Sequence, residues 1–246
     1  AKKGSATAFS EEEYFKTMEQ AWRMERRVTK NSEVMDKYDP QKKVALIVDE
    51  WGGWYDVEAG TNGAFLYQQN SMRDAMIAGL SLNIFNNHCD RVRMANLAQI
   101  VNVLQAVILT KEEKLVLTPT YHVMEMYNVH QDALMIPLSV SSNEFIMGDK
   151  KIQALSASAS KDKNNNVHIS IVNMDAGKEQ EINIDLGNLA VKSVTGRVLQ
   201  SEKIQDYNSF ENPGKIKPES FTGAKLSGKK LNVKMAPFSV VVLTLK

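Results

Sequence analysis

The chain has 246 residues, of which 43% are hydrophobic and 24% are charged, which is typical of a globular protein with one large or two smaller domains. Its 30 basic and 29 acidic residues leave a net charge of +1, so we expect no nucleic-acid or membrane partner. The single cysteine, Cys89, cannot form a disulfide within the chain. Because "AKKGSATAFS" has no apolar core of the signal-peptide kind, we expect a soluble protein, and both the cytoplasm and the periplasm or exterior stay open.

The first half of the chain predicts helices that alternate with strands. A helix should begin at Ser10, since Glu13 completes a capping box, and should fade near residues 30–33. The continuous apolar run at 42–50 is typical of a strand buried on both faces, as in parallel sheets. Further predicted elements are a helix over 65–88, a strand within 92–102, and an extended piece followed by a helix from Pro119 within 115–127. This order is typical of an α/β domain.

Beyond residue 128 the pattern changes to short strands separated by turns. Strands are predicted over 167–174, 181–186, 231–235 and 238–246, and most of them alternate apolar with polar residues. Such strands predict an antiparallel, jelly-roll-like β-sandwich. A (β/α)8 barrel needs about 250 residues, and the α/β part here has about half that. The predicted fold class is therefore α/β plus all-β: the C-terminal portion of a (β/α)8 TIM barrel over 1–128, followed by a β-sandwich domain over 129–246.

A carboxylate pair follows the first predicted strand, in "VALIVDEWGGWY" at 44–55. In parallel α/β domains the C-terminal ends of the strands carry the chemistry, and side chains alternate, so either Asp49 or Glu50 should face a site. Trp51 and Trp54 follow at once, and aromatic faces stack on the C–H faces of sugar rings. A carboxylate beside them can attack or stabilise an oxocarbenium-like centre. The alternative is that the glutamate only closes a loop through hydrogen bonds.

At this segment the sequence resembles the α-L-arabinofuranosidases of glycoside hydrolase family 51. "DEWGGWY" is similar to their nucleophile segment, which commonly has the sequence DEWNVWY, and "HCDRVRMANLAQIVNV" is similar to the segment that follows. The resemblance is strong over 42–128, and the sandwich follows by position because the family ends in one. It implies an enzyme that releases terminal α-L-arabinofuranosyl residues from polysaccharides or oligosaccharides.

The resemblance also implies roles for three residues. Glu50 matches the catalytic nucleophile, Trp54 an aromatic residue that lines the substrate cleft, and Gln99 a glutamine that hydrogen-bonds the arabinose. The sequence departs from the family pattern at Gly52 and Gly53, which replace a polar-apolar pair. We expect the two glycines to make this loop more flexible and to affect the leaving-group preference more than the reaction.

The family's acid/base is a glutamate after an asparagine on an earlier barrel strand, and no such pair precedes Glu50 here. We therefore expect this chain to supply the nucleophile half of the site and to be inactive alone. The expected partners are an arabinofuranosyl carbohydrate and either a second copy of the chain or the remainder of the barrel. The alternative is a non-catalytic β-sandwich or assembly module of a larger glycosidase. His88 and Cys89 have no neighbour at ligand spacing, so we expect no metal and no cofactor.

Overall fold

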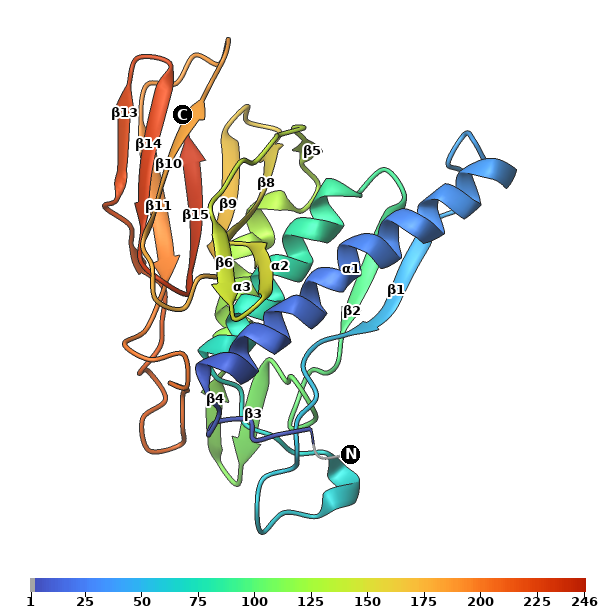
Figure 1. Cartoon of the computed structure of the whole chain (residues 1–246), viewed down its shortest axis with the longest axis vertical. Helices are drawn as coiled ribbons and strands as arrows, with labels where there is room; N and C mark the ends of the chain where they lie inside the picture. Colours follow the sequence, from blue (N-terminus) through green and yellow to red (C-terminus); the bar gives the residue numbers. More distant parts are fainter. Residues whose placement is uncertain (1–2) are drawn as a thin grey trace.

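The computed structural model describes residues 3–246, with helices α2 and α3 between a small parallel sheet and a β-sandwich (Figure 1). The α/β part contains α1 (Glu11–Tyr38), β1 (Leu46–Trp51), η1 (Gly63–Phe65), α2 (Met72–Asn87), β2 (Val92–Leu97), β3 (Ile108–Lys111), β4 (Lys114–Leu117), α3 (Pro119–Tyr127) and η2 (Asn128–His130). Helix α2 contacts α1, α3 and β2, and on the other side it contacts strands of the sandwich. The helices therefore join the two β regions through one layer.

Strands β1 and β2 form a parallel pair, as the sequence pattern predicts. Leu46 pairs with Val92 and Ile47 pairs with Met94. In the described residues β1 has no other neighbour, and Ile47 and Met94 are 38% and 53% exposed. The prediction that this strand is buried on both faces is therefore wrong for this chain, because helices cover only one face. The two strands do not close a barrel within residues 3–246.

Helix α1 begins as predicted and ends later than predicted. Both halves of the capping box are present, with the Ser10 side chain accepting from the Glu13 N–H and the Glu13 side chain accepting from the Ser10 N–H. The helix continues to Tyr38, beyond the predicted end near residues 30–33. Its last turn carries Asp36, which pairs with the buried Arg91. This tertiary contact supports a helix end that local sequence does not signal.

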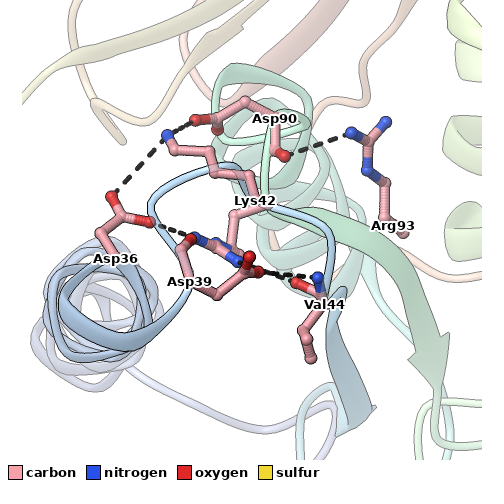
Figure 2. A network of polar contacts seen from close by, with 7 residues as sticks. Asp36, Asp39, Lys42, Val44, Asp90 and Arg93 are labelled. Carbon is pink, nitrogen blue, oxygen red and sulfur yellow. Dashed lines mark hydrogen bonds and ion pairs between the residues drawn. The ribbon is translucent and has the colours of Figure 1, made fainter.

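A polar network that includes Asp39, Lys42, Val44 and Asp90 connects the amino ends of β1 and β2 (Figure 2), and Arg91 makes its central contacts. Arg91, the residue immediately before β2, has a side chain that is 0% exposed. Its guanidinium donates to Asp39 Oδ2 at 2.8 Å and to the Val44 carbonyl at 2.9 Å. Lys42 pairs with Asp90 on the outer side of the network. A carbonyl and carboxylates thus surround this cation, as a buried charge requires.

The helix predicted over 65–88 begins later. Residues 66–70 are not helical, and α2 starts after Ser71, whose N–H donates to Asp74 Oδ2 at 2.8 Å. The S-x-x-D spacing at 71–74 is therefore the true start signal. The sequence prediction also missed the hairpin of β3 and β4, which pair in antiparallel register. Helix α3 begins at Pro119 as predicted.

The second half is an antiparallel sandwich of two main sheets. The larger sheet has the order β12-β11-β15-β9-β8-β5 and the smaller has the order β10-β14-β13, while β6 and β7 form a separate hairpin. The strands are β5 (Leu134–Met135), β6 (Glu144–Met147), β7 (Lys150–Gln153), β8 (Leu155–Lys161), β9 (Val167–Asn173), β10 (Gln180–Asp185), β11 (Val194–Leu199), β12 (Glu219–Ser220), β13 (Ala224–Ser227), β14 (Lys230–Met235) and β15 (Ser239–Leu245). The four strands that the sequence predicted correspond to β9, β10, β14 and β15.

Strand β9 is buried on both faces, although its alternating sequence predicts one face in water. Every residue of β9 is buried. Helix α2 packs on this sheet, so Ser170 and His168 lie under the helical layer instead of in solvent. Buried hydrogen bonds satisfy the polar groups there, including one between Ser170 Oγ and His130 Nε2 at 2.6 Å. The predicted boundary at residue 128 stays a prediction, since one apolar cluster includes both Met76 and Val172.

Candidate active site

The carboxyl end of β1 presents two exposed carboxylates. The pairing with β2 is irregular between Val48 and Trp51, and Asp49 and Glu50 lie in this irregular stretch. Both residues are exposed. Trp51 returns to the face that packs on α2, since its ring contacts Phe85 edge-on with 5.7 Å between centroids. Because of this irregularity both acidic side chains are exposed, whereas the alternation predicted from the sequence would direct them to opposite faces.

Glu50 and Trp54 share one cavity of about 380 Å³. Its wall consists of Lys3, one face of α1, the last two residues of β1, the segment after them and two residues of α2. The lining residues are Lys3, Thr17, Gln20, Ala21, Met24, Arg27, Glu50, Trp51, Gly52, Gly53, Trp54, Tyr55, Ile77 and Ser81. Among these described residues Glu50 is the only carboxylate, and Lys3 and Arg27 are the cations. Asp49 does not line the cavity, which distinguishes the two neighbouring acids.

The two tryptophans of this segment have different environments. Trp51 is 4% exposed and belongs to the core, whereas Trp54 is 50% exposed. The Lys3 ammonium lies 2.9 Å from the centroid of the Trp54 ring, a cation–π arrangement. Asp56 fixes the neighbouring backbone, because its carboxylate accepts from the N–H groups of Lys3 and Gly4. Trp54 is therefore the indole that a ligand in the cavity could stack on.

Gln99 lies after β2, beside the end of β1 but outside this cavity. It is exposed and is not among the lining residues. The preceding residue holds the segment to β1, since the Ala98 N–H donates to the Trp51 carbonyl at 2.9 Å, and the Ala98–Gln99 peptide bond is cis. The structure thus brings Glu50 and Trp54 together in one cavity. It places Gln99 on the adjacent strand end, exposed to solvent.

Sequence reasoning missed two buried glutamines that contact this segment. Gln105 is 0% exposed and Gln68 is 1% exposed. The Gly53 N–H donates to Gln105 Oε1 at 2.6 Å, and the Gly53 carbonyl accepts from Gln68 Nε2 at 3.1 Å. The glycine pair was expected to make the loop more flexible, yet the N–H and the carbonyl of Gly53 are both hydrogen-bonded. A polar residue inside the apolar run "VNVLQAVI" was the available signal for Gln105.

Asp74 is a fully buried acid below the same loop. One carboxylate oxygen caps α2, while Oδ1 has no hydrogen-bond partner among the described residues. Burial raises the pKa of Asp74 to about 6, and the nearby Arg73 opposes part of that rise. Burial also raises the pKa of Tyr55, with Asp74 adding to the effect. This acid was not a sequence candidate, because S-x-x-D indicates only a helix cap.

The remaining titratable candidates have structural surroundings. His88 caps the C-terminus of α2, and its Nε2 lies 2.6 Å from Glu25 Oε1, which raises the pKa of the imidazole. Over residues 3–246 no group of three or more histidine, cysteine, aspartate or glutamate side chains is placed to hold a metal ion. Within the same residues no helix combines the length and apolarity that a membrane crossing requires.

Comparison with known proteins identifies the family. A family model described as the α-L-arabinofuranosidase C-terminal domain matches residues 49–239. An intracellular exo-α-L-arabinofuranosidase of Bacteroides ovatus is 46% identical over 245 residues, which are 99% of this chain and 48% of that protein. A probable α-L-arabinofuranosidase C of Aspergillus niger is 26% identical over 172 residues, covering 65% of this chain and 34% of that protein.

The structural comparison gives the same result. The crystal structure of the GH51 arabinofuranosidase from Xanthomonas axonopodis pv. citri superimposes with a TM-score of 0.98 and 44% sequence identity, covering 100% of this chain and 50% of that chain. The chain thus spans about half the length of these bacterial relatives. It belongs to the α-L-arabinofuranosidases of glycoside hydrolase family 51 and corresponds to their C-terminal part.

Proposed function

We propose that this chain supplies the nucleophile half of a retaining α-L-arabinofuranosidase site within a longer protein. The observation that carries the proposal is the shared cavity, in which the exposed Glu50 lies with the half-exposed Trp54 at the carboxyl end of a parallel strand. Residues 1–128 are then part of a (β/α)8 barrel and residues 129–246 a sandwich domain. The substrates are polysaccharides or oligosaccharides with terminal arabinofuranosyl groups.

The exposed apolar face of the parallel pair supports the barrel part of the proposal. Ile47 and Met94 are register partners, and both are exposed. The interior of a barrel is filled by bulky apolar side chains from the inward faces of its strands. We propose that barrel strands outside this chain cover that face. The proposal leaves open whether those strands belong to the same polypeptide or to a partner chain.

The mechanism assigns one step to each group. Glu50 attacks the anomeric carbon and forms a covalent glycosyl-enzyme as the leaving oxygen departs, and water then hydrolyses the intermediate. A retaining site needs a second carboxyl group about 5–5.5 Å from the first, which protonates the leaving oxygen and then deprotonates the water. Since Glu50 is the only carboxylate among the described residues lining the cavity, we assign that group to the rest of the protein. Trp54 stacks on the sugar and Gln99 hydrogen-bonds it.

Trapping of the intermediate tests the nucleophile assignment. The full-length protein would be incubated with a 2-deoxy-2-fluoro-arabinofuranosyl fluoride, which forms the glycosyl-enzyme but hydrolyses slowly. We expect peptide mapping to find the added sugar mass on Glu50. A label on another residue, or none in a protein that still cleaves aryl arabinofuranosides, would overturn the assignment.

Residues 1–246 alone test the incomplete site. We expect no turnover of aryl arabinofuranosides, because one carboxyl group is missing. A purified chain that turned over at about 10 s⁻¹, the median of enzymes in general, would contradict the half-site proposal while leaving the family assignment unchanged.

A further inference from the structure

The glycine pair between Glu50 and Trp54 is held by side chains from distant parts of the chain. The Gly53 N–H donates to Gln105 Oε1 at 2.6 Å. Gln68 spans the other side, donating to the Gly53 carbonyl at 3.1 Å and accepting from the Tyr55 N–H at 2.8 Å. These two glutamine amides fix the backbone of the segment that connects Glu50 to Trp54. The segment itself has no side chain at 52 or 53.

The hydrogen bonds of Gln105 admit only one orientation of its amide. Nε2 donates to the Asp74 carbonyl at 2.8 Å and to Thr120 Oγ1 at 3.0 Å, so both of its protons are used. A flipped amide would place its oxygen against the Asp74 carbonyl and its NH2 against the Gly53 N–H. Because Gln105 is 0% exposed, no water can compensate for such mismatches. The first turns of α2 and α3 therefore aim Oε1 at Gly53.

Glycine at 52 and 53 makes room for this arrangement. A Cβ at 52 would lie 3.3 Å from both Cβ and Oε1 of Gln105, and the backbone φ of +134° is one that favours glycine. A Cβ at 53 would lie 3.0 Å from Asp74 Oδ1 and from Tyr55 Oη. The departure from the DEWNVWY pattern thus coincides with a buried amide that occupies space beside the loop.

Gln105 also contacts the second strand end. Its own N–H donates to the Ala98 carbonyl at 3.0 Å, next to Gln99. One residue therefore bridges the segment that carries Glu50 and Trp54 to the segment that carries Gln99. We propose that Gln105 is a positioning residue that sets the placement of Trp54 relative to Gln99, and that Gly52 and Gly53 are the residues that admit it. This inference rests on the proposed function of the site.

Substitution of Gln105 by methionine in the full-length protein tests the role in catalysis. The change keeps the volume and removes all three side-chain hydrogen bonds. We expect kcat/KM on an aryl arabinofuranoside to fall roughly 10- to 100-fold, with a clear rise in KM, because small misplacements of substrate-holding groups have effects of this size. Gln200→Met, at an exposed sandwich position, is the matched control and should change neither constant.

The KM distinguishes positioning from a merely structural role. Partial unfolding would lower the apparent kcat and leave the KM of the folded molecules unchanged. An unchanged KM in a folded Gln105→Met protein would therefore overturn the inference. If that variant does not fold, Thr120→Val removes one acceptor of the Gln105 amide and should raise KM in the same direction by a smaller factor; no rise would count equally against the inference.

Amide hydrogen exchange tests the loop without reference to activity. In residues 1–246, mass spectrometry with electron-transfer fragmentation of the peptide over 51–55 separates Gly53 from Tyr55. We expect Gln105→Met to speed exchange at Gly53 at least tenfold with little change at Tyr55, and Gln68→Met to do the reverse. If the two variants changed the exchange rates at Gly53 and Tyr55 equally, or not at all, the proposal that each glutamine fixes its own backbone group would be wrong. If exchange behaves as expected but the full-length protein is not an arabinofuranosidase, the proposed function is wrong. The conclusion that Gln105 and Gln68 fix the loop backbone is then still supported.

Discussion

The β1–β2 pair has a buried charged residue at its amino ends and an exposed charged residue at its carboxyl ends. At the amino ends, Arg91 is buried and is surrounded by carboxylates and backbone carbonyls (Figure 2). At the carboxyl ends, Glu50 is exposed on a cavity beside a half-exposed tryptophan. In barrel proteins the amino-terminal face serves stability and the carboxyl-terminal face serves chemistry. The proposed function implies the same division in these two strands, so that each end can be tested by its own kind of measurement.

The largest effect is expected at the carboxyl end. Glu50→Gln in the full-length protein should lower kcat by at least about 10³-fold, because an amide cannot form the glycosyl-enzyme. The melting temperature should stay within about 2 °C of the parent protein, since the side chain is exposed. Asp49→Asn is the matched control: Asp49 is also exposed but does not line the cavity, so we expect less than a tenfold loss of kcat. Equal losses for the two variants would remove the distinction between them.

The opposite result is expected at the amino end. Arg91→Met should lower the melting temperature by roughly 10 °C, because it removes the buried donor to the Asp39 carboxylate and leaves the Val44 carbonyl without that hydrogen bond. The kcat of the folded full-length protein at 25 °C should change less than about twofold. Arg93→Met, which removes only one long contact to the Asp90 carbonyl, should change melting little. If folded Arg91→Met lost as much kcat as Glu50→Gln, the two ends would not differ in function.

Asp74 is a second test of the difference between the two ends, because it is a buried ionisable group near the carboxyl end. Its pKa in the folded protein is about 6, above the ordinary value of 3.8. The folded state therefore binds the proton more tightly than the unfolded chain. The resulting stabilisation is fully present below about pH 3.8 and is lost as the pH rises through about 6, a change of about 3 kcal/mol in the free energy of unfolding.

Asp74→Asn removes this titration. The free energy of unfolding of the variant, measured in urea from pH 4 to pH 7, should rise relative to the parent protein by up to about 3 kcal/mol. Asp149→Asn, at an exposed position, should track the parent protein at every pH. If Asp74→Asn also tracked the parent protein, the acid would titrate normally despite its burial.

Local signals predicted much of the fold. The Ser10 capping box, the helix start at Pro119 and the strands predicted at 181–186 and 231–235 depend on neighbours in sequence, and the structure contains each of them. Strand β8 escaped prediction because the apolar residues that alternate with serine in "LSASASK" are mostly small alanines, yet the strand lies buried between α2 and the smaller sheet. Its burial depends on tertiary packing, which the local pattern does not encode.

The candidate site likewise has features that local sequence predicts and features that depend on tertiary contacts. The segment "DEWGGWY" places Glu50 and Trp54 four residues apart, and the structure adds that both line one cavity. The contribution of Gln105 could not be predicted, because it lies 52 residues beyond the Gly53 N–H that it accepts from. Contacts of that separation appear only when the chain is folded.

The close approach of α2 to the sandwich has a practical consequence for protein engineering. A Cβ at Gly79 would lie 2.7 Å from Val172 Cγ2 and 3.4 Å from Val240 Cγ2, so the helix rests directly on the sheet. Transplanting this sandwich onto a different α/β domain would require a recipient helix that also has glycine at the turn facing the sheet. Chimeras that ignore this requirement would separate the two layers by the width of a methyl group and expose apolar surface along their junction.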